Sequence, residues 1–89
     1  MNKYEVIKNK VVNIISEYTE IDIKELTDEK KIVADIGFSS FDMFFLVSEI
    51  EKNLEIQIEM NEEFAEITTL EELCQFILKQ NNDKKEGQD

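Results

Sequence analysis

Apolar residues recur at helical spacing in three separate stretches of the chain. Across residues 2–18 an apolar side chain returns every three or four positions, which is the spacing of one helix face. The members of this stripe are Tyr4, Ile7, Val11, Ile14, Ile15 and Tyr18. Residues 40–53 and a stretch from about Leu70 to residue 80 show the same spacing. The pattern therefore predicts three main helices.

Polar residues stand where these helices are expected to begin. Asn2 lies three positions before Glu5, and Ser39 lies three before Asp42, which is the spacing of a capping box. Thr-Thr-Leu-Glu-Glu at residues 68–72 offers the same box in two registers. These signals place Ser39 at the cap of the second helix and leave the hydroxyl of the next residue free.

The segments between the helices have different patterns. Residues 19–38 show no sustained period and form a long loop, anchored by its apolar residues Ile21, Ile23, Leu26, Ile32, Val33 and Ile36. Residues 54–60 alternate like a strand, but without a convincing partner strand we interpret them as an extended connection with inward isoleucines. Asn61 is expected to cap a short helix through Glu66. The predicted fold is an all-α four-helix bundle, with three main helices, one short helix and a long first loop.

Length and composition favour a small cytoplasmic domain. The 89 residues fit one domain, which we place at residues 1–80, followed by a disordered polar tail over residues 81–89. No apolar run is long enough to span a bilayer, and the first residues lack a secretory signal. The single cysteine, Cys74, excludes an internal disulfide and falls on the apolar stripe, so we expect an inert core thiol.

Charge narrows the possible partners. The formal net charge is −11, and the chain contains no histidine. Such an excess of like charge favours a monomer, makes nucleic acid an improbable partner and favours proteins with basic docking surfaces. Without histidine, a Ser-His-Asp hydrolase cannot be assembled within this chain.

The most informative motif is Asp-Ile-Gly-Phe-Ser-Ser-Phe-Asp at residues 35–42. A glycine turn, in which Gly37 supplies a backbone conformation that other residues resist, leads directly into a strongly apolar helix. Ser40 is then the first helical residue, exposed and rigidly placed. A hydroxyl in that position suits a side chain that is modified and presented to other proteins.

Three segments in order resemble the acyl carrier protein family. Residues 12–17 resemble its first helix, residues 35–42 its attachment motif Asp-Leu-Gly-x-Asp-Ser-Leu-Asp, and residues 67–73 the start of its last helix. The resemblance implies that a phosphopantetheinyl transferase joins the 4'-phosphopantetheine of coenzyme A to Ser40. Acyl groups would then be held as thioesters, and the carrier itself would supply no catalytic residue and no metal ligand.

The sequence departs from this motif in two places. Ser39 replaces the acid that normally precedes the modified serine. One face of the second helix carries Phe41, Phe45, Ser48 and Lys52, where family members more often have glutamates. We interpret Phe41 and Phe45 as a docking surface aided by the nearby acids Asp42 and Glu49. Burial under the long loop is the competing interpretation. The neighbouring stripe of Phe44, Leu46, Val47 and Ile50 is expected to be core, and the sequence leaves open a second use of these residues as the lining of an acyl pocket.

Two alternatives to an acyl carrier remain at this point. An aminoacyl or peptidyl carrier of a natural-product or cell-wall pathway would use the same serine for a different cargo. An acidic interaction module would keep the fold without being modified. A stand-alone enzyme is disfavoured by the absence of histidine.

Overall fold

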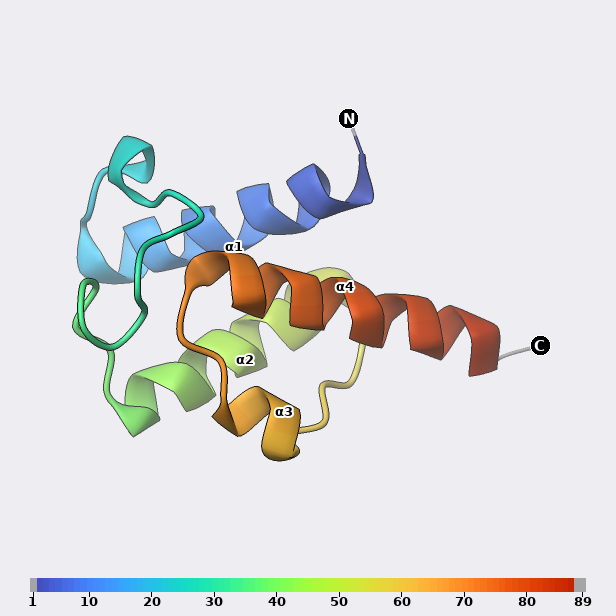
Figure 1. Cartoon of the computed structure of the whole chain (residues 1–89). Coiled ribbons are helices and arrows are strands. Elements are labelled where there is room, and N and C mark those ends of the chain that lie inside the picture. Colours follow the sequence, from blue (N-terminus) through green and yellow to red (C-terminus); the bar gives the residue numbers. More distant parts are fainter. Residues whose placement is uncertain (1, 88–89) are drawn as a thin grey trace.

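The computed structural model describes residues 2–87, with side chains described through residue 81. The elements are α1 (Lys3–Thr19), a 3₁₀ turn η1 (Ile23–Glu25), α2 (Ser40–Leu54), α3 (Glu62–Ala65) and α4 (Leu70–Gly87). Figure 1 shows α4 running beside α1 and passing in front of the far end of α2, with the short α3 below α4. In the described part of the chain, β-structure is limited to an isolated bridge between Lys31 and Thr69. The all-α prediction with three long helices is confirmed.

The helices begin where local capping predicts. The Asn2 side chain accepts a 2.8 Å hydrogen bond from the Glu5 amide at the start of α1. The Asn61 side chain does the same for the Phe64 amide at the start of α3. At the start of α4, the Glu72 carboxylate accepts from the amides of Thr68 and Thr69. Each cap satisfies amides that have no partner within their own helix.

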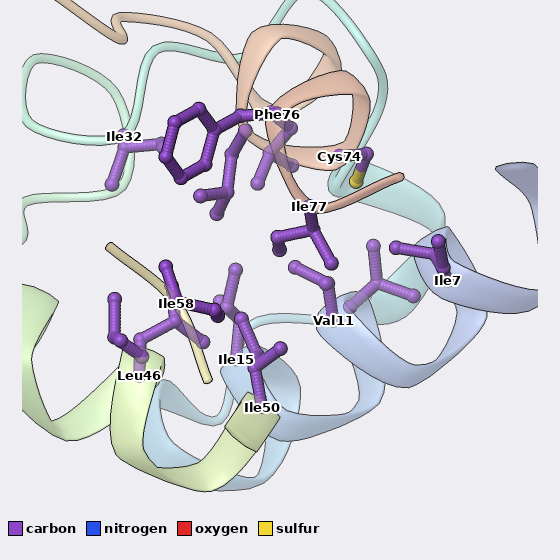
Figure 2. Packing of buried hydrophobic residues seen from close by; sticks show 14 of the residues in the cluster. Ile7, Val11, Ile15, Ile32, Leu46, Ile50, Ile58, Cys74, Phe76 and Ile77 are labelled. Atoms are coloured by element: carbon purple, nitrogen blue, oxygen red, sulfur yellow. The ribbon is translucent and has the colours of Figure 1, made fainter. Parts of the chain in front are cut away.

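One apolar core joins all the segments. Helix α1 contacts both α2 and α4 and presents Ile7, Val11, Val12 and Ile15 to them. Figure 2 shows Ile7, Val11 and Ile15 of α1 in one cluster with Leu46 and Ile50 from α2 and with Phe76 and Ile77 from α4. Cys74 is fully buried in the same cluster, as the sequence predicted. Burial of this apolar surface is the main stabilising contribution in so small a domain.

The extended connection after α2 closes one side of the core. Ile56 and Ile58 are buried, and the Ile58 amide donates a 2.8 Å hydrogen bond to the Glu51 carboxylate. Figure 2 shows Ile58 pointing toward the side chains of α2. The interpretation of residues 54–60 as a connection with inward isoleucines is therefore confirmed.

The long first loop is fastened to the start of α4. The Ile32 amide donates to the Thr68 carbonyl at 2.8 Å, and the Leu70 amide donates to the Lys30 carbonyl at 2.9 Å. Leu26 and Ile32 are buried as expected. The prediction is wrong for Ile23 and Val33, which are exposed, because the loop turns twice and can direct only some of its apolar side chains inward.

Helix α4 is longer than the sequence predicted. It continues to Gly87, whereas we expected an end near residue 80 and a disordered tail over residues 81–89. Each residue added to a helix that has already formed gains one backbone hydrogen bond, which favours extension. The chain contains no proline to stop the helix. Residues 88 and 89 lie outside the described residues. A domain boundary at residue 80 stays a prediction.

Candidate functional site

The turn before α2 is held by its own backbone. The Gly37 amide donates to the Val33 carbonyl and the Phe38 amide to the Ile32 carbonyl, both at 3.1 Å. Gly37 has a φ of +90°, a conformation that side-chain-bearing residues rarely adopt. Phe38 then enters the core at 4% exposure. The turn thus fixes the chain immediately before the two serines.

Ser39 and Asp42 form the predicted capping box. The Asp42 amide donates to Ser39 Oγ at 3.3 Å, while Asp42 Oδ2 accepts from the Ser39 amide at 2.8 Å. Ser39 Oγ also lies 3.0 Å from Asp42 Oδ2. The bond from the Ser39 amide, followed by one from the Tyr18 hydroxyl, lowers the pKa of the Asp42 carboxyl. This carboxylate therefore remains ionised and engaged in the cap at neutral pH.

Ser40 is the first residue of α2, and it is exposed. Its position beyond the cap is the one that the sequence predicted. Because the chain contains no histidine, this hydroxyl has no imidazole base of its own.

An open hollow of about 370 Å³ lies beside Ser40. The long loop, α2, α3 and the segments next to α3 contribute its lining, which is almost entirely apolar: Ile32, Val33, Met43, Phe44, Met60, Phe64, Ala65 and Ile67, with Ser40 and Asn61. A flexible arm joined to Ser40 fits this arrangement, since its root is exposed and an apolar surface adjoins it.

Phe44 corrects one expectation. It was assigned to the core with Leu46, Val47 and Ile50, but 58% of its surface is exposed, whereas the other three are buried. Six of the seven residues from Phe41 to Val47 are apolar, so the stripe is wider than the face that α1 and α4 can cover. Phe44 lines the hollow beside Ser40 instead.

The two aromatic residues proposed for docking differ in their surroundings. Phe41 is 85% exposed. Phe45 is 40% exposed, because its ring stacks on Tyr18 with centroids 4.4 Å apart. Sequence reasoning placed Tyr18 only in the apolar stripe and missed this contact, for which a single helix period gives no signal. Of the acids expected to aid docking, Asp42 is engaged in the cap and Glu49 lies 3.4 Å from Lys52.

The described residues offer neither a metal site nor a membrane-spanning helix. No group of three or more Cys, Asp or Glu side chains in that part of the chain is placed to hold a metal ion. Among the helices that the structure describes, none combines the length and apolarity needed to cross a membrane.

An exposed serine at a capped helix start, beside an apolar hollow in a small acidic bundle, is the arrangement expected of a carrier domain with a covalently attached arm. Comparison with known proteins agrees. The model of the phosphopantetheine attachment site family matches residues 9–77. An acyl carrier protein of Thermotoga maritima is 30% identical over 79 residues, which cover 89% of this chain and 96% of that relative. The chain belongs to the acyl carrier protein family, whose covalent cofactor is 4'-phosphopantetheine.

Proposed function

We propose that this protein is an acyl carrier that holds acyl intermediates as thioesters on a 4'-phosphopantetheine arm attached to Ser40. It presents them to partner enzymes in fatty-acid, lipid or polyketide-type biosynthesis. The observation that carries the proposal is the exposure of Ser40 as the first helical residue after a fixed turn. Membership of the acyl carrier protein family supports the same role.

Attachment of the arm needs a transferase that brings coenzyme A and magnesium. The Ser40 oxygen forms a bond to the β-phosphorus of coenzyme A, and the bond from that phosphorus to the nucleotide breaks. Adenosine 3',5'-bisphosphate leaves, and the hydroxyl proton passes to a base of the transferase. This chain contributes the placement of the hydroxyl, because the Ser39 and Asp42 cap fixes the start of α2.

The hollow beside Ser40 supports an acyl cargo over an aminoacyl one. Burial of a methylene group stabilises a bound chain by about 0.8 kcal/mol. Phe44, Met60 and Phe64 offer such burial within the hollow. A charged ammonium group on an aminoacyl cargo would lose hydration there without gaining an ionic partner from the lining residues.

The partners that we propose are the transferase and acyl-transferring or acyl-modifying enzymes with basic docking surfaces. A net charge of −11 attracts basic surfaces and disfavours self-association, which supports a monomeric carrier. Use of coenzyme A as the donor of the arm supports a cytoplasmic location. The carrier is not an enzyme in this proposal, since every bond is made or broken by a partner.

The cargo can be tested on protein isolated from its native cells. Intact-mass measurement before and after hydroxylamine treatment should reveal a phosphopantetheine adduct that carries a hydroxylamine-labile acyl group. A labile group with the mass of an amino acid would support the aminoacyl alternative. Protein that is never modified would support the acidic interaction module and contradict the proposal.

A further inference from the structure

Tyr18 in the last turn of α1 contacts the chain on both sides of Ser40. Its hydroxyl donates a 2.5 Å hydrogen bond to Asp42 Oδ1. Its ring meets the edge of Phe38 with centroids 5.8 Å apart and an interplanar angle of 82°. The same ring stacks on Phe45 at 4.4 Å and 24°. One side chain of α1 therefore holds residues two before, two after and five after the serine.

These contacts complete the hydrogen bonding of the cap. Asp42 uses Oδ2 to accept from the Ser39 amide and uses Oδ1 to accept from Tyr18. A carboxylate held at both oxygens keeps one orientation, whereas a carboxylate held at one oxygen can rotate away from the helix. The Tyr18 hydroxyl thus restrains the group that defines where α2 begins.

We propose that Tyr18 is a positioning residue for the modification of Ser40, acting through Asp42. Its hydroxyl keeps the first turn of α2 formed while the transferase acts, so that the serine oxygen stays aligned with the phosphorus that it attacks. This inference rests on the proposed function, because it assumes that Ser40 receives the arm. It adds a role for α1, which contains no part of the attachment motif.

The effect is local rather than global. Tyr18 is 47% exposed, so when its hydroxyl is removed, water can supply much of the hydrogen bonding that Asp42 loses. Helix ends open at much lower free energy than the whole domain unfolds, so a restraint at the first turn changes the shape of the site more than the melting temperature. Loss of alignment at the reacting atom slows a group transfer even when binding is intact.

The chain offers a matched control at the other end of α1. The Tyr4 hydroxyl donates a 2.9 Å hydrogen bond to Asp28 Oδ1, which is the same pair of chemical groups. Tyr4 is fourteen residues from Tyr18, or about 21 Å along a helix. Tyr4→Phe removes a hydroxyl–carboxylate bond far from Ser40, whereas Tyr18→Phe removes one beside it and retains the aromatic ring.

The test compares initial rates of phosphopantetheine transfer from coenzyme A to the apo forms of wild type, Tyr18→Phe and Tyr4→Phe. Tyr18→Phe should lower kcat roughly three- to tenfold with little change in KM, while Tyr4→Phe transfers at the wild-type rate. In an Asp42→Ala background, Tyr18→Phe should have little further effect, because the two groups act as one unit. The melting temperature of each variant is measured alongside.

Three results would overturn the inference. Tyr18→Phe transferring at the wild-type rate would remove any role in positioning. Equal slowing by Tyr4→Phe and Tyr18→Phe would assign the effect to general stability. Full additivity with Asp42→Ala would show that the hydroxyl does not act through that carboxylate. If wild type itself accepts no arm, the proposed function has failed and this inference fails with it, so the two failures are distinguishable.

Discussion

The backbone amide of Ile32 donates a 2.8 Å hydrogen bond to the carbonyl oxygen of Thr68. The bond joins the long first loop to the residues that begin α4, beside the bridge between Lys31 and Thr69. Because the same loop continues through Gly37 to Ser40, α4 supports the proposed attachment site without contributing a residue to the motif. Figure 1 shows this loop passing beside the start of α4 before it reaches α2.

Substitution of Gly37 should weaken the turn that precedes the site. Gly37 has a φ of +90°, and apart from Gly37 and its two chain neighbours no residue has an atom within 4 Å of the position that a Cβ would occupy. Gly37→Ala therefore meets only the backbone cost of this conformation, about 1–2 kcal/mol of unfolding free energy. Urea unfolding measures this loss of unfolding free energy. Gly37→Asn is the control and should cost less, since asparagine tolerates positive φ better. Unchanged stability in both variants would contradict the account.

Phe41 should act in docking and not in folding. With 85% of its surface exposed, Phe41→Ala should change the unfolding free energy by less than about 0.5 kcal/mol. The same substitution should slow acyl transfer with a partner enzyme, because an aromatic anchor at the centre of an interface can contribute roughly thirtyfold or more in affinity. Leu46→Ala is the stability control, with an expected cost of about 2–5 kcal/mol.

Substitution of Phe45 should affect both the stability of the domain and its docking to partners. Its ring stacks on Tyr18 and remains 40% exposed, so Phe45→Ala should destabilise the domain measurably while also slowing transfer. Stopped-flow or single-turnover transfer assays, corrected for the folded fraction, separate the two effects. Unchanged transfer by the folded fraction of both the Phe41 and Phe45 variants would place the docking surface elsewhere.

Salt should stabilise the fold. A net charge of −11 produces repulsion that salt screens and that divalent cations reduce further. The melting temperature should rise from low to moderate sodium chloride, and magnesium chloride at equal ionic strength should raise it more. A melting temperature that is unchanged by either salt would show that this repulsion does not limit stability.

The lone cysteine should not interfere with measurement of the arm. Burial raises the pKa of the Cys74 thiol to about 12, so it stays neutral and protected at neutral pH. A disulfide reagent should find no fast-reacting thiol in native apo protein and one in native phosphopantetheine-bearing protein. In denaturant, the apo protein should also show one. Fast reaction of native apo protein would mean that Cys74 is accessible.

The helices and the position of Ser40 could be predicted because their signals are local. Apolar spacing identified α1, α2 and α4, and the three-residue spacing of Ser39 and Asp42 located the start of α2. A capping box involves only residues that are close in the sequence, so its members can be read from the sequence without knowledge of the packed structure.

Contacts between distant segments could not be predicted in this way. The Tyr18 and Asp42 bond joins residues 24 positions apart, and no periodic pattern pairs them. The exposure of Phe44 depends on how much of a wide apolar stripe α1 and α4 cover, which is a property of the packed bundle. The bridge from Lys31 to Thr69 likewise arises only when the loop folds back on α4.

The most direct test of the central claim is the intact mass of apo protein after incubation with coenzyme A, magnesium and a phosphopantetheinyl transferase. Wild type should gain the mass of one phosphopantetheine, and Ser40→Ala should gain none. Ser39→Ala should still gain it, although more slowly, because it loses the cap of α2 but keeps the nucleophile. Addition of the arm to Ser40→Ala, or its loss in Ser39→Ala alone, would contradict the assignment of Ser40.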